Sequence, residues 1–158
     1  MKKLISNITA IAMGAFAFIG LLFTALNVFG KITDALYGSA TGYQFISFSQ
    51  NYVTGADVTT IEIFYSIFAI IMFVVAACLI AVSLLRMFAD KKKSKLNMIQ
   101  NALACVLALV SILVLVFAIV YVQQFNLIGF YAKIGMATIL TCAVSVVGAV
   151  LVLLFNKK

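Results

Sequence analysis

Residues 61–95, IEIFYSIFAIIMFVVAACLIAVSLLRMFADKKKSK, are the most informative part of the sequence, because a long apolar run in them ends in a short basic turn. The run exceeds the roughly 20 apolar residues that a helix needs to cross a hydrocarbon core about 30 Å thick. A second apolar run follows at once, from residue 96 to residue 122. The pattern predicts two antiparallel, neighbouring transmembrane helices at 61–89 and 96–122, joined by a turn at 90–95.

Two further apolar runs flank this pair, at residues 4–29 and 134–155. The first run follows Lys2 and Lys3, as the apolar part of a signal peptide would. It is too long for such a segment, which has about 7–15 apolar residues, and no clear A-x-A cleavage site ends it. We therefore expect a retained helix. The sequence predicts an all-α integral membrane protein, a bundle of four transmembrane helices that forms a single membrane domain over residues 1–158.

The composition supports this class. Of the 158 residues, 66% are hydrophobic and only 9% are charged, whereas roughly a quarter of the residues of a soluble domain are charged. An apolar medium must therefore cover most of the exterior, and the lipid bilayer is the expected partner. Four spans and two outer loops, at 30–60 and 123–133, leave no room for a separate soluble domain.

The first outer loop, residues 30–60, is long and polar. Residues 43–53 alternate in character and are rich in β-forming and aromatic residues, which predicts a short β-strand or hairpin within the loop. At the end of the loop, Thr59 or Thr60 is suited to cap the second span. Glu62 falls in the first turn, where a carboxylate suits the helix dipole.

The charges predict the orientation. One side of the predicted bundle carries nine Lys or Arg residues and Asp90, and the other carries Lys31 and Lys133 with Asp34, Asp57 and Glu62. The positive-inside rule then predicts that both termini and the 90–95 turn are cytoplasmic. The basic residues lie at the ends of apolar segments rather than on a face interleaved with aromatics, so nucleic acid is not an expected partner. Ten lysines against one arginine are typical of an AT-rich bacterial genome, and we expect the bacterial plasma membrane.

The sequence contains no pattern for catalysis or metal binding. It has no histidine, no acidic residue in the middle of a span and no CxxC motif, so we expect no catalytic, metal or cofactor site. Ion-coupled transport generally needs an ionisable group within the membrane, and no acidic, basic or histidine side chain lies in the middle of a span. Cys78, Cys105 and Cys142 lie in apolar runs and are expected to be free, small apolar side chains.

Two spans carry small residues at helical spacing. These residues are Ser6, Ala10 and Gly14 in the first span and Ala137, Thr141, Ser145 and Ala149 in the fourth. Small residues allow helix backbones to approach closely, and van der Waals contacts then drive association. The pattern fits packing within one bundle, and it also fits contact between subunits.

Some polar residues near the predicted membrane boundaries allow more than one interpretation. Asn97, Gln100 and Asn101 lie in the first turns of the third span, where they would face lipid headgroups, bond across helices or line a cytoplasmic vestibule. Glu62 and Arg86 lie near opposite ends of the second span, from where both can reach the interface.

Aromatic residues gather on the outer side, which holds all six tyrosines. Those near helix ends fit an interfacial belt. For Tyr43 and Tyr52, in the middle of the first outer loop, an extracellular contact surface is an equal alternative, and its candidate residues are Tyr43, Phe45, Phe48 and Tyr52.

The arrangement of four spans, inside termini and a long first outer loop resembles that of claudin-type tetraspan proteins and of large-pore channel subunits. The chain departs from both, because it has no tryptophan and its loops have no cysteine. The resemblance implies an oligomer, with or without a channel. We expect a non-catalytic protein that assembles with itself through its helices and outer loop. An accessory or scaffold subunit for another membrane protein is the alternative, and a facilitator for a small neutral solute is the third hypothesis.

Overall fold

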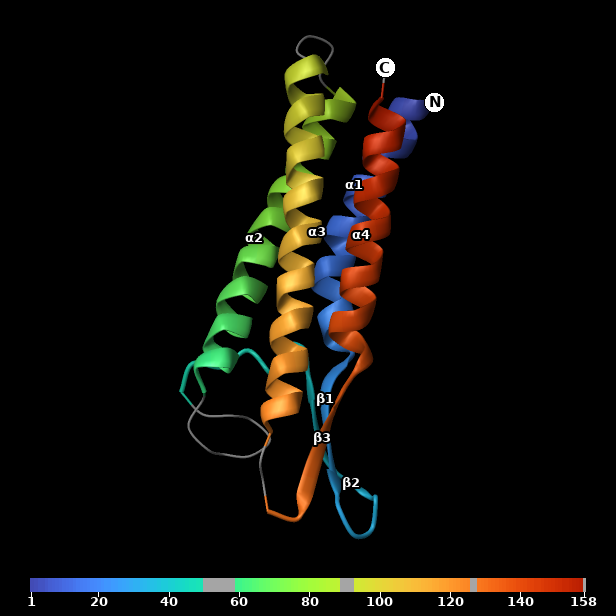
Figure 1. The fold of residues 1–158 in the computed structure, drawn as a ribbon. Helices are drawn as coiled ribbons and strands as arrows, with labels where there is room; N and C mark the ends of the chain where they lie inside the picture. Colours follow the sequence, from blue (N-terminus) through green and yellow to red (C-terminus); the bar gives the residue numbers. More distant parts are fainter. Residues whose placement is uncertain (50–58, 89–92, 126–127, 158) are drawn as a thin grey trace.

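The computed structural model describes residues 1–49, 59–88, 93–125 and 128–157. These residues are mostly helical, and four long helices run side by side in one bundle (Figure 1). Both termini lie at one end of the bundle, here called the terminal end, and a small sheet extends from the other, the sheet end. The helices are α1 (Lys2–Ile19), α2 (Thr60–Phe88), α3 (Lys93–Gln124) and α4 (Met136–Asn156).

The length and composition of the helices match the prediction of four apolar spans. All four are long and apolar enough to cross a membrane, the first together with the turn that follows it. Helix α2 has 29 residues, and at a rise of about 1.5 Å per residue it is roughly 44 Å long. Each helix packs against the next along the chain, and α4 closes the bundle against α1.

The first helix is shorter than the predicted span at 4–29, and this part of the prediction is wrong. Helix α1 ends at Ile19, a 3-10 turn follows at Gly20–Leu22, and Thr24–Gly30 form strand β1. Hydropathy does not reveal the transition from helix to strand, because β1 is nearly as apolar as α1.

A period of two within this run marks the strand. Leu26 and Val28 are buried, whereas the alternate residues Asn27 and Phe29 are partly exposed. Successive side chains of a strand point to opposite faces, so one face of β1 packs on the core and the other faces outward.

Strand β1 is the centre of a three-stranded antiparallel sheet with the order β2-β1-β3. Its neighbours are β2 (Leu36–Thr41) and β3 (Phe130–Ile134). Val28 lies opposite Gly38 on one side and opposite Ala132 on the other. The outer edges of β2 and β3 pair with no other strand among the described residues.

The strand predicted at 43–53 is wrong in its described part. Residues 42–45 form a turn instead, in which the Tyr43 N–H donates to the Leu21 carbonyl at 3.2 Å, and residues 50–53 lie outside the described residues. The first outer loop does take part in a hairpin, but β1 and β2 form it. The second loop adds β3, which the sequence did not predict.

The other helix boundaries are close to the predicted ones. Thr59 caps α2 reciprocally with Glu62: the Glu62 N–H donates to Thr59 Oγ1 at 3.4 Å, and the Thr59 N–H donates to Glu62 Oε2 at 2.6 Å. This capping box confirms the predicted start of the second span. Helix α4 begins at Met136 rather than at Ile134, because Ile134 ends β3.

Gly135 joins β3 to α4 at a point where two backbones nearly touch. Its N–H donates to the Ala25 carbonyl at 2.8 Å. A Cβ atom at this position would collide with the backbone carbonyl of Thr24, so only glycine fits. This backbone contact connects the start of α4 to the start of β1.

Candidate functional site

The terminal end of the bundle holds a cluster of buried polar side chains around Arg86, in the last turn of α2. Arg86 is only 6% exposed. Every helix contributes to this arginine cluster, whose members are Ser6 and Asn7 of α1, Ser83 and Arg86 of α2, Gln100 and Asn101 of α3, and Asn156 of α4.

The guanidinium of Arg86 faces oxygens from the three other helices. Nη1 lies 3.2 Å from Ser6 Oγ, 3.3 Å from Asn7 Oδ1 and 2.9 Å from Asn156 Oδ1, and it also donates to Gln100 Oε1. Nε is buried and has no partner among the described residues. One guanidinium therefore ties α1, α3 and α4 to α2.

Gln100, which is fully buried, is the second centre of the cluster. Its Nε2 donates to Asn7 Oδ1 at 3.0 Å and to Ser83 Oγ at 2.8 Å. Its Oε1 accepts from Ser6 Oγ at 3.1 Å and from Asn156 Nδ2 at 3.0 Å. A single amide thus contacts all three neighbouring helices.

The positive charge of the cluster has no carboxylate beside it among the described residues. The two described carboxylates, Asp34 and Glu62, belong to the sheet end, and Asp57 and Asp90 lie outside the described residues. Because a guanidinium stays protonated in proteins, the cluster holds a fixed positive charge. It can orient side chains and attract an anion, but its amides and hydroxyls are poor proton carriers.

Arg86 and Glu62, near opposite ends of α2, are both buried within the protein. Glu62 is 2% exposed because its carboxylate is used in the cap of α2. Gln100 and Asn101 of the third span form hydrogen bonds to other helices, which was one of the three alternatives for these residues. Asn101 Oδ1 accepts from Asn156 Nδ2 at 2.6 Å. Asn97 Nδ2 donates to the Asn156 carbonyl at 3.4 Å.

A signal for this cluster exists in the sequence. Each of the four apolar runs carries one or more amide or hydroxyl residues close to its basic end. Similar distances from that end place these residues at one depth, where a lone arginine needs partners.

The small residues of the first and fourth spans lie inside the bundle. Ser6, Ala10, Ala137, Thr141, Ser145 and Ala149 are all buried, as is Gly14. A Cβ atom at Gly14 would lie 3.1 Å from the Ala76 carbonyl oxygen of α2, and one at Gly148 would lie 3.0 Å from Met13 of α1. These residues bring the helices of a single chain together.

The hydroxyls of Thr141 and Ser145 make no hydrogen bond to another helix among the described residues. Thr141 Oγ1 donates to the Ala137 carbonyl one turn earlier in α4, at 2.7 Å. The Ser145 hydroxyl is buried without a partner among the described residues. Close packing, not hydrogen bonding, is therefore the role of these two residues.

The aromatic residues of the first outer loop divide into buried and exposed members. Phe45 is 4% exposed and packs edge-on against Tyr65 and Tyr121, with ring centroids 4.6 Å and 5.0 Å away. Tyr43 is partly exposed and donates its hydroxyl to the Phe18 carbonyl at 2.5 Å. Phe48 is 54% exposed, and Tyr52 lies outside the described residues. Phe45 is thus a core residue and not a contact residue.

The outward face of the sheet carries a second group of interacting side chains. Lys133 Nζ lies 5.5 Å from the centre of the Phe29 ring and 5.6 Å from that of Tyr131, within the range of a cation–π contact. The Tyr131 hydroxyl donates to Asp34 Oδ1 at 3.0 Å, and this bond raises the pKa of Tyr131. The sheet end therefore presents an ordered aromatic and charged surface.

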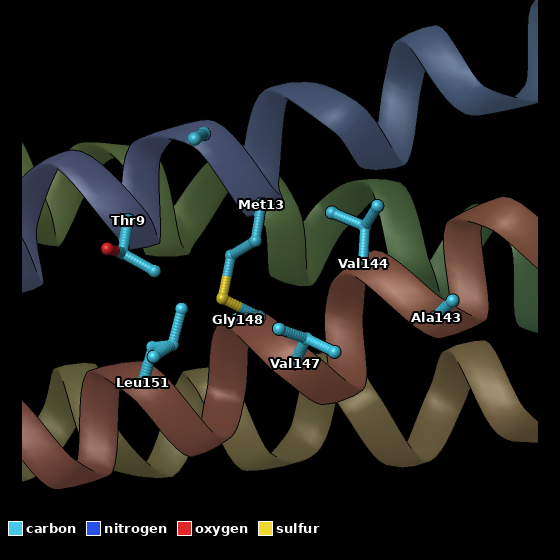
Figure 2. A pocket seen from close by; sticks show the side chains of 8 residues that line it. Thr9, Met13, Ala143, Val144, Val147, Gly148 and Leu151 are labelled. Atoms are coloured by element: carbon cyan, nitrogen blue, oxygen red, sulfur yellow. The ribbon is translucent and has the colours of Figure 1, made fainter.

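Two cavities flank α1. The larger, about 330 Å³, lies between α1 and α4, where Met13 points toward Gly148 (Figure 2). It carries no charge, and its lining consists of Thr9, Ala12, Met13, Ala143, Val144, Val147, Gly148 and Leu151. The smaller, about 260 Å³, lies at the terminal end beside the arginine cluster and is lined by Met1, Lys3, Leu4, Asn7 and Met87.

The three cysteines are free, and Cys78 is exposed while Cys105 and Cys142 are partly exposed. The described residues contain no group of three or more His, Cys, Asp or Glu residues that could hold a metal ion. Comparison with known proteins finds no match for this chain among family models, curated proteins or solved structures.

Proposed function

We propose that this chain is a non-catalytic membrane protein that assembles with copies of itself through the edges of its three-stranded sheet. In this proposal the four helices cross the bacterial plasma membrane, the terminal end is cytoplasmic and the sheet is external. The observation that carries it is the outer edge of β2, where Leu36 and Tyr37 are 59% and 64% exposed.

The charges of the two ends support this orientation. Lys2, Lys3, Arg86, Lys95 and Lys157 belong to the terminal end, where the described residues include no carboxylate. The sheet end holds Lys31 and Lys133 together with both described carboxylates. Basic residues are retained on the cytoplasmic side of a membrane, so the terminal end is assigned to the cytoplasm.

An open strand edge is a ready site for another strand. Its backbone N–H and C=O groups are unpaired on one side, and proteins that do not use such an edge commonly block it with charge or proline. Strand β2, LYGSAT, contains neither. An edge that pairs with no other described strand supports strand addition as the mode of assembly.

The sheet topology favours a particular pairing between copies in one membrane. Strands β2 and β3 both run antiparallel to β1, so they are parallel to each other. Copies in one membrane share an orientation, and the β2 edge of one copy can therefore meet the β3 edge of the next as a parallel pair. Such a head-to-tail contact closes into a ring or continues as a row. A ring would enclose a central space, as the channel hypothesis requires.

The helices support assembly less well than the sheet does. The small residues that favour close helix contact are already buried between helices of the same chain. A subunit contact through them would require the bundle to open. The exposed sheet edge needs no such change.

The mass of the complex purified in detergent tests the proposal. Wild-type protein should run as an oligomer, and Leu36→Lys should lower its mass because a charge on β2 opposes strand addition. Ile32→Lys is the matched control, since Ile32 is 96% exposed in the turn before β2 and this change should leave the mass unaltered. A monomeric wild-type protein would refute self-assembly, and a second chain co-purifying with that monomer would favour the accessory-subunit alternative.

The orientation has its own test. Ser49 and Ser94 are both exposed, and each can be changed to cysteine in a variant that lacks the three native cysteines. An impermeant thiol reagent added to intact cells should label the protein at position 49 and not at position 94. The reverse pattern would overturn the orientation.

A further inference from the structure

We infer that the cavity at the terminal end, between the first turns of α1 and the last turn of α2, binds the phosphate of an anionic phospholipid headgroup. Its lining combines a cation, an amide and apolar side chains, namely Lys3, Asn7, Met1, Leu4 and Met87. This inference rests on the membrane insertion proposed above, but it does not depend on self-assembly.

Asn7 offers the cavity an unused hydrogen-bond donor. Its side chain is 1% exposed, and its Oδ1 accepts from both Arg86 Nη1 and Gln100 Nε2. These two donors fix the orientation of the amide, because a flipped amide would set N–H groups against them. The Nδ2 group therefore lies on the side away from the cluster, and it has no partner among the described residues.

The electrostatic setting of the cavity favours an anion. Lys3 is half-buried in the lining, and no described carboxylate belongs to this end of the bundle. The Arg86 guanidinium lies one amide away, since it contacts the oxygen of the same Asn7 side chain. A phosphate in the cavity would receive an ammonium and an amide donor, with the guanidinium charge behind them.

The apolar part of the lining selects a lipid over a free ion. Leu4 and Met87 are 50% and 41% exposed, and in a membrane they would face the acyl-chain side of a headgroup bound beside them. Basic pockets between helices on the cytoplasmic side of a membrane are suited to anionic headgroups. The cavity is at that level in the proposed orientation.

Binding is tested with the full-length protein in detergent by adding phosphatidylglycerol, phosphatidylcholine or inorganic phosphate. A ligand that binds only the folded state raises the melting temperature, and the rise grows as its concentration exceeds its Kd. Native mass spectrometry counts the bound lipids. Phosphatidylglycerol should raise the melting temperature and remain bound, whereas phosphatidylcholine and inorganic phosphate should do neither. Equal stabilisation by inorganic phosphate would assign the cavity to a free anion and overturn the lipid assignment.

Two substitutions and one control locate the site. Lys3→Gln should weaken phosphatidylglycerol binding about fivefold, while Lys2→Gln, which removes an exposed charge from the same turn but not from the lining, should not. Asn7→Asp keeps an acceptor for Arg86, so the fold should survive, but it replaces the free donor with a charge that repels phosphate. Equal losses in Lys2→Gln and Lys3→Gln, or full binding by a folded Asn7→Asp protein, would show that the cavity is not the site.

Discussion

At the terminal end the four helices are joined by polar side chains, whereas at the sheet end they are joined by backbone ladders and aromatic rings. The first arrangement concentrates the contacts of all four helices on two residues, Arg86 and Gln100. The second spreads them over three strands and the rings around Phe45. Single side chains should therefore control the stability of the terminal end, while the sheet end should tolerate most single changes outside its buried rings.

The largest effect is expected from Gln100→Leu. This change removes bonds to five side chains. It also leaves the buried guanidinium with fewer partners, and the loss typically costs about 3–5 kcal/mol of unfolding free energy. The measurement is chemical or thermal unfolding in detergent. Gln124→Leu makes the same substitution at an exposed position near the other end of α3 and should have almost no effect. Similar losses in both variants would mean that the cluster does not stabilise the bundle.

The next effect, at the sheet end, is expected from Phe45→Ala. Loss of a buried phenyl group costs about 3 kcal/mol or more, and here it also removes two edge-on ring contacts. Phe48→Ala is the control, because Phe48 is 54% exposed. If the Phe48 change were the more damaging of the two in the same unfolding assay, the assignment of Phe45 to the core would be wrong.

A smaller effect is expected between the two ends, from Ser145→Leu. Ser145 is 1% exposed, and overpacking a filled site costs about 1–3 kcal/mol. Because the residue packs within one chain, the change should lower the melting temperature without altering the mass of the complex. Val146→Leu, at a neighbouring residue that is 37% exposed, should change neither quantity. A lower mass with unchanged stability would place Ser145 in a subunit contact instead.

The smallest effect concerns the charged group on the outward face of the sheet. The hydrogen bond to Asp34 raises the pKa of Tyr131 above its ordinary value of 10.0. The bond therefore stabilises the fold below pH 10, and this stabilisation is lost as the pH rises through the raised pKa of Tyr131. Asp34→Asn should lower the pKa toward 10. A spectrophotometric titration, read against Tyr131→Phe, isolates this tyrosine. An unchanged titration would mean that the carboxylate does not act on Tyr131.

Much of the helical architecture could be predicted because hydropathy and length determine it. The runs at 61–89 and 96–122 correspond to α2 and α3, and the capping pair Thr59 and Glu62 begins α2 as expected. These features depend on residues close together in the chain. Local sequence is sufficient for them.

The strands and the arginine cluster depend on contacts between distant residues, and this is why they were missed. Leu26 and Val28 are compatible with a helix until β2 and β3 pair with them from outside the run. Arg86 at a helix end would ordinarily extend to water. Its burial requires that Gln100 and Asn156 lie at the same depth, which only the packed bundle determines.

The junction at Gly135 also has a mechanical consequence. Strand β1 continues from α1 through a short turn, and β3 enters α4 through Gly135 alone, whose N–H is bonded back to Ala25. The paired strands β1 and β3 thus act as a rigid extension of the α1–α4 pair. A pull on the sheet would load α1 and α4 directly. It would reach α2 and α3 only by way of side-chain packing.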